Sequence, residues 1–139
     1  MNEAELAEKA AFVRDALAEL EALPQDTLES FLADRRNLPA ALHWLQTAIQ
    51  ALVDLGLMQV ASLGARTPRT SLDVLEALEE AGRLPPGSAQ RFRPVIGFRN
   101  RVVHLYDRVD PEIVYRVVTE DRDDLRELLR LLLDAADSE

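Results

Sequence analysis

The chain has no cysteine, so it cannot form disulfide bonds or bind a metal through thiolates. Its longest apolar stretch, residues 38–60, is interrupted by histidine, glutamine and aspartate and does not predict a membrane span. Residues 1–5 are acidic where an export signal would be basic, so we expect a cytoplasmic protein. Glycine-rich nucleotide loops and the G-x-S-x-G motif of many hydrolases are also absent from the sequence, which removes several enzyme classes.

Metal-binding patterns are equally scarce. The two histidines, His43 and His104, lie far apart in the sequence, and no pair has the H-x3-H spacing of helical zinc sites. We therefore expect no metal site and no cofactor. His43 stands beside Trp44 without other reactive residues nearby, so we interpret it as a packing or surface residue.

The charge of the chain is unevenly distributed. The net charge is −9, which argues against a general coating of nucleic acid. Residues 83–108 reverse this sign, because they contain several arginines and Asp107 as their only acid. This basic segment is where we expect the protein to meet an anion. Its arginines are Arg83, Arg91, Arg93, Arg99, Arg101 and Arg108.

Apolar residues recur at steps of three and four, which predicts helices along the first part of the chain. A first helix runs from Glu3 to before Pro24, and Asp26 caps a short second helix. A long third helix spans residues 38–63 and ends at Gly64.

The second part of the chain is also predicted to be helical. Thr70 or Ser71 caps a helix that stops at Gly82, and Ser88 opens a segment in which Pro94 must begin or kink the helix. Asp110 caps a turn, and a final helix covers residues 121–133. Alternating strand patterns are weak. We predict an all-α, antiparallel helical bundle, with four main helices and shorter ones, as a single domain over residues 1–139.

The segment Arg99-Asn100-Arg101-Val102-Val103-His104-Leu105-Tyr106 concentrates the most reactive side chains in the chain. It has the pattern R-x4-H-x-Y. Arginine is a permanent cation suited to phosphate, histidine exchanges protons near neutral pH, and tyrosine carries a nucleophilic hydroxyl. The combination indicates phosphodiester chemistry, although a lone histidine and tyrosine more often complete a core.

The spacing within this motif suggests a dimer. On a single helix, Arg99 and His104 would point about 140° apart. One way to bring them to a common site is a second copy of the motif across a two-fold axis, which would make a homodimer useful. A helix end or a long reach by the guanidinium would serve as well.

Beyond the motif, the chain resembles a known family over most of its length. Residues 97–106 are similar to the core of HepT-type toxins of the HEPN superfamily, and residues 110–115 are similar to the segment that follows it. Residues 45–56 resemble the long helix of the family, with Gln50 where a glutamate is expected. HepT-type toxins are helical ribonucleases paired with an MntA-type nucleotidyltransferase antitoxin.

The resemblance implies a metal-independent endoribonuclease, and the motif has suitable chemistry. His104 would exchange protons with the RNA and Arg99 would stabilise the charged phosphate. Asn100 would orient the imidazole or bind a phosphate oxygen, while Arg101 and Arg93 would hold the RNA backbone.

Two further expectations concern regulation and selectivity. In HepT-type proteins the motif tyrosine, here Tyr106, accepts adenylyl groups from the antitoxin, which implies that its modification silences the enzyme. The rings nearest the motif are Phe92, Phe98 and Tyr106, so few can stack on bases and we expect modest sequence selectivity.

Two other kinds of function remain open at this point. The basic segment could dock a nucleotide or an acidic partner without cleaving anything. Alternatively, the chain could be a noncatalytic helical subunit of a nucleotidyltransferase complex. Turnover of RNA in the presence of a chelator would separate an enzyme from both.

Overall fold

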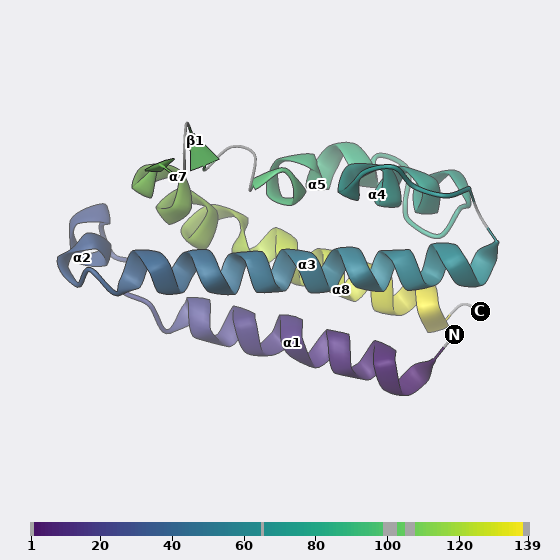
Figure 1. Ribbon diagram of the computed structural model, residues 1–139, viewed down its shortest axis with the longest axis horizontal. Helices are drawn as coiled ribbons and strands as arrows, with labels where there is room; N and C mark the ends of the chain where they lie inside the picture. The colour runs from purple at the N-terminus through teal and green to yellow at the C-terminus, as the bar shows by residue number, and fades with distance from the viewer. Residues whose placement is uncertain (1, 65, 99–102, 105–107, 138–139) are drawn as a thin grey trace.

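The protein is described by a computed structural model that covers residues 2–64, 66–98, 103–104 and 108–137, with the backbone alone for 103–104. Helices dominate the described residues and form the predicted bundle (Figure 1). The helices are α1 (Glu3–Glu21), α2 (Leu28–Ala33), α3 (Asn37–Leu63), α4 (Ser71–Glu80), α5 (Ser88–Ile96), α7 (Pro111–Arg116), the π-helix η1 (Val117–Asp121) and α8 (Arg122–Asp137). Within this described part of the chain, no helix has the length and apolar character needed to cross a bilayer.

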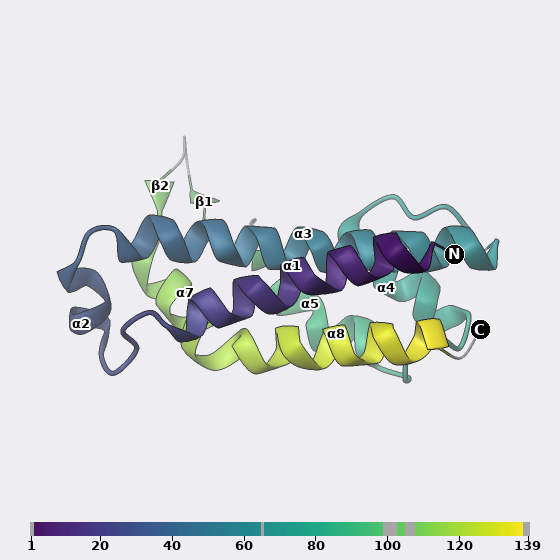
Figure 2. The same cartoon turned by 90° about the horizontal axis from the view of Figure 1, so that it is seen from below.

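The long helix α3 is the axis around which the other helices pack. It contacts α1, α4 and α8, while α5 bridges α4 and α8 (Figure 1). Figure 2 shows α1 and α8 running along the bundle beside each other, with the two termini at the same end. The short helices α2 and α7 contact each other at the opposite end.

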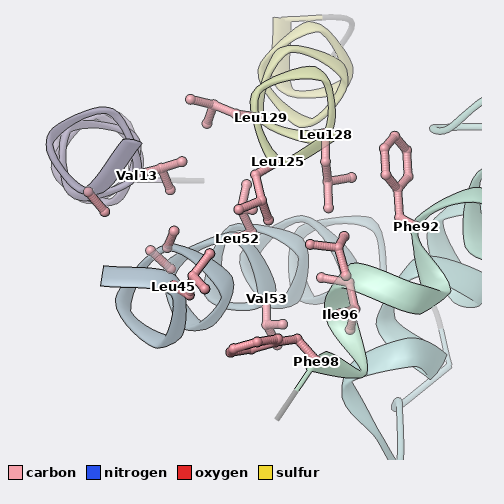
Figure 3. Packing of buried hydrophobic residues seen from close by; sticks show 14 of the residues in the cluster. Val13, Leu45, Leu52, Val53, Phe92, Ile96, Phe98, Leu125, Leu128 and Leu129 are labelled. Atoms are coloured by element: carbon pink, nitrogen blue, oxygen red, sulfur yellow. The ribbon is translucent and has the colours of Figure 1, made fainter. Parts of the chain in front are cut away.

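The core lies where α1, α3, α5 and α8 face one another. Leucines dominate it, and Leu52 of α3 and Leu125 of α8 are almost fully buried between the helices (Figure 3). The one buried glutamine, Gln59, donates from Nε2 to the backbone oxygen of Leu132 at 2.6 Å, so its burial leaves that donor satisfied. This contact ties the C-terminal part of α3 to α8.

Most predicted helix ends are confirmed. Gly64 ends α3 in the left-handed conformation at φ 66°, Thr70 caps α4, and Asp110 caps α7 with Pro111 in its first turn. The prediction that Asp26 caps α2 is wrong. Thr27 is the cap, because its hydroxyl accepts from the backbone nitrogen of Ser30 at 3.0 Å and the two residues form a reciprocal capping box.

The end of the chain is more helical than predicted. Residues 111–116 continue through η1 into α8 without a break, and α8 reaches Asp137, well past the predicted end at residue 133. The β-branched residues in this stretch lower its local helix propensity. Burial of Val114, Val117 and Val118 in the core compensates for that weakness.

A short antiparallel ladder corrects the expectation that the motif segment is entirely helical. Strand β1 (Val103–His104) pairs with β2 (Arg108–Val109), with Val103 opposite Val109 and His104 opposite Arg108. Strands of two residues are too short to produce the alternation from which strands are recognised in a sequence. His104 therefore lies on a strand.

The packing of α3 against α4 depends on a glycine. A Cβ atom at Gly56 would lie 2.5 Å from Cγ1 of Val74, a stiff β-branched side chain. We expect Gly56→Ala to introduce strain of about 2–3 kcal/mol, the upper part of the usual range for overpacking, which the better helix propensity of alanine, about 1 kcal/mol, offsets only in part. Urea denaturation measures the resulting loss of unfolding free energy.

A double variant provides the control for this prediction. Val74→Ala removes the obstructing methyl groups, so Gly56→Ala combined with Val74→Ala should lose less stability than the two single variants together. Strictly additive losses, or a Gly56→Ala protein as stable as the parent, would show that the close approach does not limit the packing.

Candidate functional site

The motif begins where α5 ends, and the structure describes part of it. Arg99, Asn100, Arg101 and Tyr106 lie outside the described residues, so their predicted roles stay predictions. His104 is the Cα partner of Arg108 in the β1–β2 ladder. The angle of about 140° between Arg99 and His104 assumed a continuous helix, and the strand at His104 removes that assumption.

The helix that leads to the motif is held at its start by a carboxylate from α4. Gly87, the residue before α5, adopts φ 89° and has no side chain to cap the helix. Glu79 provides the cap: its Oε1 accepts from the backbone nitrogen of Ala89 at 2.9 Å. The backbone hydrogen bond from Ala89, together with those from Gly87 and Ser88, holds the pKa of the Glu79 carboxyl below its ordinary value. Thus α4 positions the helix that carries the chain to Arg99.

Pro94 lies inside α5 rather than at its start, two residues before the helix ends at Ile96. The backbone nitrogen of Gly97 donates to the oxygen of Arg93 at 2.9 Å and closes the last turn. Phe98 follows and is fully buried, packed near Val53 of α3 (Figure 3). The residue next in sequence is Arg99.

The two arginines of α5 have different surroundings. Arg91 forms an ion pair with Asp124 at 3.4 Å and lies over the ring of Phe92, with its guanidinium carbon 4.8 Å from the ring centroid. Arg93 is exposed and forms no ion pair with any other described residue. Of these two arginines, Arg93 is the one whose charge no described carboxylate neutralises, and its predicted contact with RNA stays a prediction.

A groove of about 910 Å³ lies beside Arg93 and Phe98. Its longest wall is α3, its second wall joins the end of α5 to the start of α4, and α1 contributes the third. The residues that line it are Lys9, Phe12, His43, Gln46, Thr47, Ile49, Gln50, Ala51, Val53, Asp54, Thr70, Ser71, Leu72, Arg93, Ile96, Gly97 and Phe98.

The aromatic residues are arranged differently from the prediction. Phe92 and Phe98 are fully buried and cannot stack on a base. Phe12 of α1, which is 45% exposed, is the phenylalanine that the groove presents to solvent. Its exposure could not be predicted, because Phe12 stands next to the buried Val13 within an ordinary amphipathic helix.

Two further residues were not part of the predicted site. His43 is exposed, packs edge-on against Trp44 with ring centroids 4.8 Å apart, and also lines the groove. Its interpretation as a packing or surface residue is confirmed. Arg108 is exposed and opposite His104 in the ladder, a register that only the strand pairing reveals. Across the described residues, no group of three or more side chains could hold a metal ion.

Comparison with known proteins finds relatives over most of the chain. The sequence model of the family described as Ribonuclease HepT-like matches residues 13–132. A protein of Archaeoglobus fulgidus, whose name assigns it provisionally to the RNases, is 30% identical over 113 residues, covering 81% of this chain and 79% of its own. The tRNA nuclease HepT of Aphanizomenon flos-aquae is 27% identical over 93 residues, covering 67% of this chain and 63% of that protein.

A solved structure shares the fold. The tri-AMPylated HEPN toxin of Shewanella oneidensis, in complex with MNT antitoxin, superposes with a TM-score of 0.81 at 20% sequence identity, and the match covers 100% of both chains. The likeness confirms the arrangement of the helices.

Proposed function

Because the chain belongs to the HepT-like ribonuclease family, we propose that it is a metal-independent endoribonuclease whose active site is the R-x4-H-x-Y motif. The observation that carries the proposal is the position of the motif. Its first residue, Arg99, directly follows Phe98, which lines an open groove together with the exposed Arg93. An RNA strand could enter there without displacing the core.

The proposed reaction needs a proton acceptor, a proton donor and a cation. The ribose 2′-hydroxyl oxygen forms a bond to the neighbouring phosphorus, the bond from phosphorus to the 5′-oxygen breaks, and a cyclic phosphate remains. His104 takes the proton of the 2′-hydroxyl or gives one to the leaving oxygen, and Arg99 stabilises the extra negative charge. No step requires a metal.

The remaining motif residues support this chemistry. Asn100 orients the imidazole or hydrogen-bonds a phosphate oxygen, and Arg101 holds the RNA backbone. Arg93 does the same from the groove, where no described carboxylate pairs with it. A guanidinium suits this work because it can contact two phosphate oxygens at once.

The proposed biological role is that of the toxin in a toxin–antitoxin pair. An MntA-type nucleotidyltransferase would be the antitoxin and would adenylylate Tyr106. The tri-AMPylated HEPN toxin of Shewanella oneidensis, in complex with MNT antitoxin, supports this proposal by analogy. A symmetric homodimer is also part of the proposal. It rests on the resemblance to HepT-type toxins, since His104 lies on a strand and the helical angle no longer supports it.

Incubation of the purified chain with end-labelled single-stranded RNA in excess EDTA tests the proposal. We expect cleavage at the same rate with and without the chelator, because no proposed step uses a metal ion. RNA that is bound but left intact would favour a noncatalytic binding module. Failure to bind RNA, with binding to a nucleotidyltransferase, would favour a structural subunit, and a rate that falls in EDTA would contradict metal independence.

A further inference from the structure

The α3 wall of the groove carries a row of polar side chains. His43, Gln46 and Gln50 follow one another at steps of three and four residues, which places them on one face of the helix. All three are exposed, and all three line the groove. Glutamine amides can both donate and accept hydrogen bonds, as the edges of nucleic-acid bases do.

The charges of the groove favour an anionic occupant. It contains the cations Lys9 and Arg93 and one described carboxylate, Asp54, although the whole chain has a net charge of −9. Asp54 is already engaged, with Lys9 at 3.4 Å and the Gln50 amide at 2.9 Å. Arg93 therefore faces the groove without a described counter-ion.

The size and aromatic content of the groove fit unpaired nucleotides. Its volume of about 910 Å³ is within the range of pockets that enclose small organic ligands, about 300–1,000 Å³. Phe12 adds an exposed ring, and recognition of single-stranded RNA combines ring stacking with hydrogen bonds to base edges.

We propose that this groove binds the unpaired nucleotides next to the cut, with Gln46 and Gln50 reading base edges and Phe12 stacking on a base. The inference rests on the proposed ribonuclease function and adds a specificity site to it. The groove combines amide groups, an arginine without a described counter-ion and an exposed ring, which are the kinds of group that recognise single-stranded RNA.

Gln50 has a defined orientation in the groove. Its Nε2 donates one amide hydrogen to Oδ1 of Asp54, which leaves its carbonyl oxygen to accept from a ligand and its second amide hydrogen to donate. Adenine presents a donor and an acceptor side by side, N6–H and N7, which match an amide group. Cut sites should therefore be enriched in adenine at the nucleotide that Gln50 reads.

The test compares one charge change at three glutamines. Gln46→Glu and Gln50→Glu place a carboxylate in the groove, whereas Gln90→Glu places the same charge at an exposed position of α5 outside it. We expect kcat/KM for single-stranded RNA to fall roughly tenfold for the two groove variants through repulsion of phosphate, and less than about twofold for Gln90→Glu.

A neutral variant tests base reading separately. Gln50→Met keeps the length of the side chain and removes both the carbonyl acceptor and the amide donors. Sequencing of the fragments cut from a random RNA pool should show that the preference for adenine at this nucleotide weakens by about threefold, the contribution of one hydrogen bond. Thermal melting shows whether each variant folds. If Gln50→Glu does not fold, Gln46→Glu alone decides the test, since Gln46 makes no side-chain hydrogen bond to another described residue.

The outcomes distinguish this inference from the function on which it rests. If the parent protein cuts RNA and the groove variants behave like Gln90→Glu, the groove does not bind substrate and the inference is overturned. If Gln46→Glu changes the particle mass in light scattering but not kcat/KM, the groove is a contact between copies, which also overturns it. A parent protein that never cuts RNA removes the ribonuclease function itself.

Discussion

His104→Ala is expected to lower the rate of RNA cleavage by roughly 10²–10⁴-fold, the usual contribution of a general acid or base. Alanine cannot accept the 2′-hydroxyl proton or protonate the leaving oxygen. The substitution falls in a two-residue strand outside the helices of the bundle, so the bundle should stay folded. Single-turnover cleavage of labelled RNA measures the loss, and circular dichroism verifies the helices.

The other histidine is the contrasting variant. His43 lies on the groove wall and packs against Trp44, so His43→Ala should weaken RNA binding by a few-fold and leave the rate at saturating RNA unchanged. Equal cleavage rates for the parent and His104→Ala would remove His104 from catalysis. A large loss of the saturating rate in His43→Ala instead would move the proton transfer to α3.

The role of Arg99 can be tested by a substitution that preserves its charge. Lysine provides one ammonium where arginine offers a planar pair of donors, so Arg99→Lys should still cut RNA roughly 10–100-fold more slowly. Arg91→Lys is the matched control, because Arg91 is paired with Asp124 outside the groove and should tolerate the change. Similar rates for both variants would indicate that Arg99 provides only bulk positive charge.

Adenylylation of Tyr106 is expected to silence cleavage while the bundle stays folded. In the transfer, the phenolic oxygen bonds to the α-phosphorus of ATP, pyrophosphate leaves, and the phenolic proton passes to a base or to water. The product adds a negative phosphate and the bulk of a nucleotide two residues from His104. It would thereby compete with the RNA phosphate for the same arginines.

The experiment incubates the protein with its cognate nucleotidyltransferase and ATP, and measures mass and RNA cleavage on the same samples. The chain has two tyrosines, so Tyr115→Phe is a matched control for Tyr106→Phe. The Tyr115 hydroxyl donates to the backbone oxygen of Gln25 at 2.7 Å, and its ring lies 5.5 Å from that of Phe31. It is therefore engaged in holding α7 to α2 and to the loop that precedes α2.

Tyr115→Phe should gain the adenylyl mass and lose activity like the parent, and Tyr106→Phe should do neither. If the Tyr106→Phe protein still gained mass, the acceptor would be another residue. If modified Tyr106 left cleavage intact, the tyrosine would have no regulatory role.

Most of the helices could be predicted, because their ends depend on residues close by in the sequence. The end of α3 at Gly64 and the caps at Thr70 and Asp110 follow from residues close to each helix end. The helical content of residues 111–121 could not be predicted, since it depends on burying valines against helices that are distant in the sequence. The cap at Thr27 was missed because Asp26 and Thr27 are both good capping residues, and only the reciprocal bond with Ser30 distinguishes them.

For the candidate site as well, features that depend on residue types could be predicted, and features that depend on the folded arrangement could not. The basic segment, the motif and Arg93 were recognisable from residue types alone. The groove was not, because it joins Lys9 and Phe12 to residues of α3 and α5 that are distant along the chain. The burial of Phe92 and Phe98 was equally hidden, since aromatic residues serve cores and ligand sites alike.

The burial of Phe98 places the boundary between the core and the reactive segment at a single peptide bond. Phe98 is fully enclosed, and the next residue is the arginine on which the proposed chemistry depends. Since interiors are close-packed, a change of volume around this ring displaces the backbone that leads into the motif. A change of volume at Val53, which packs near this ring, should therefore affect cleavage as well as stability, because the two properties meet at this junction.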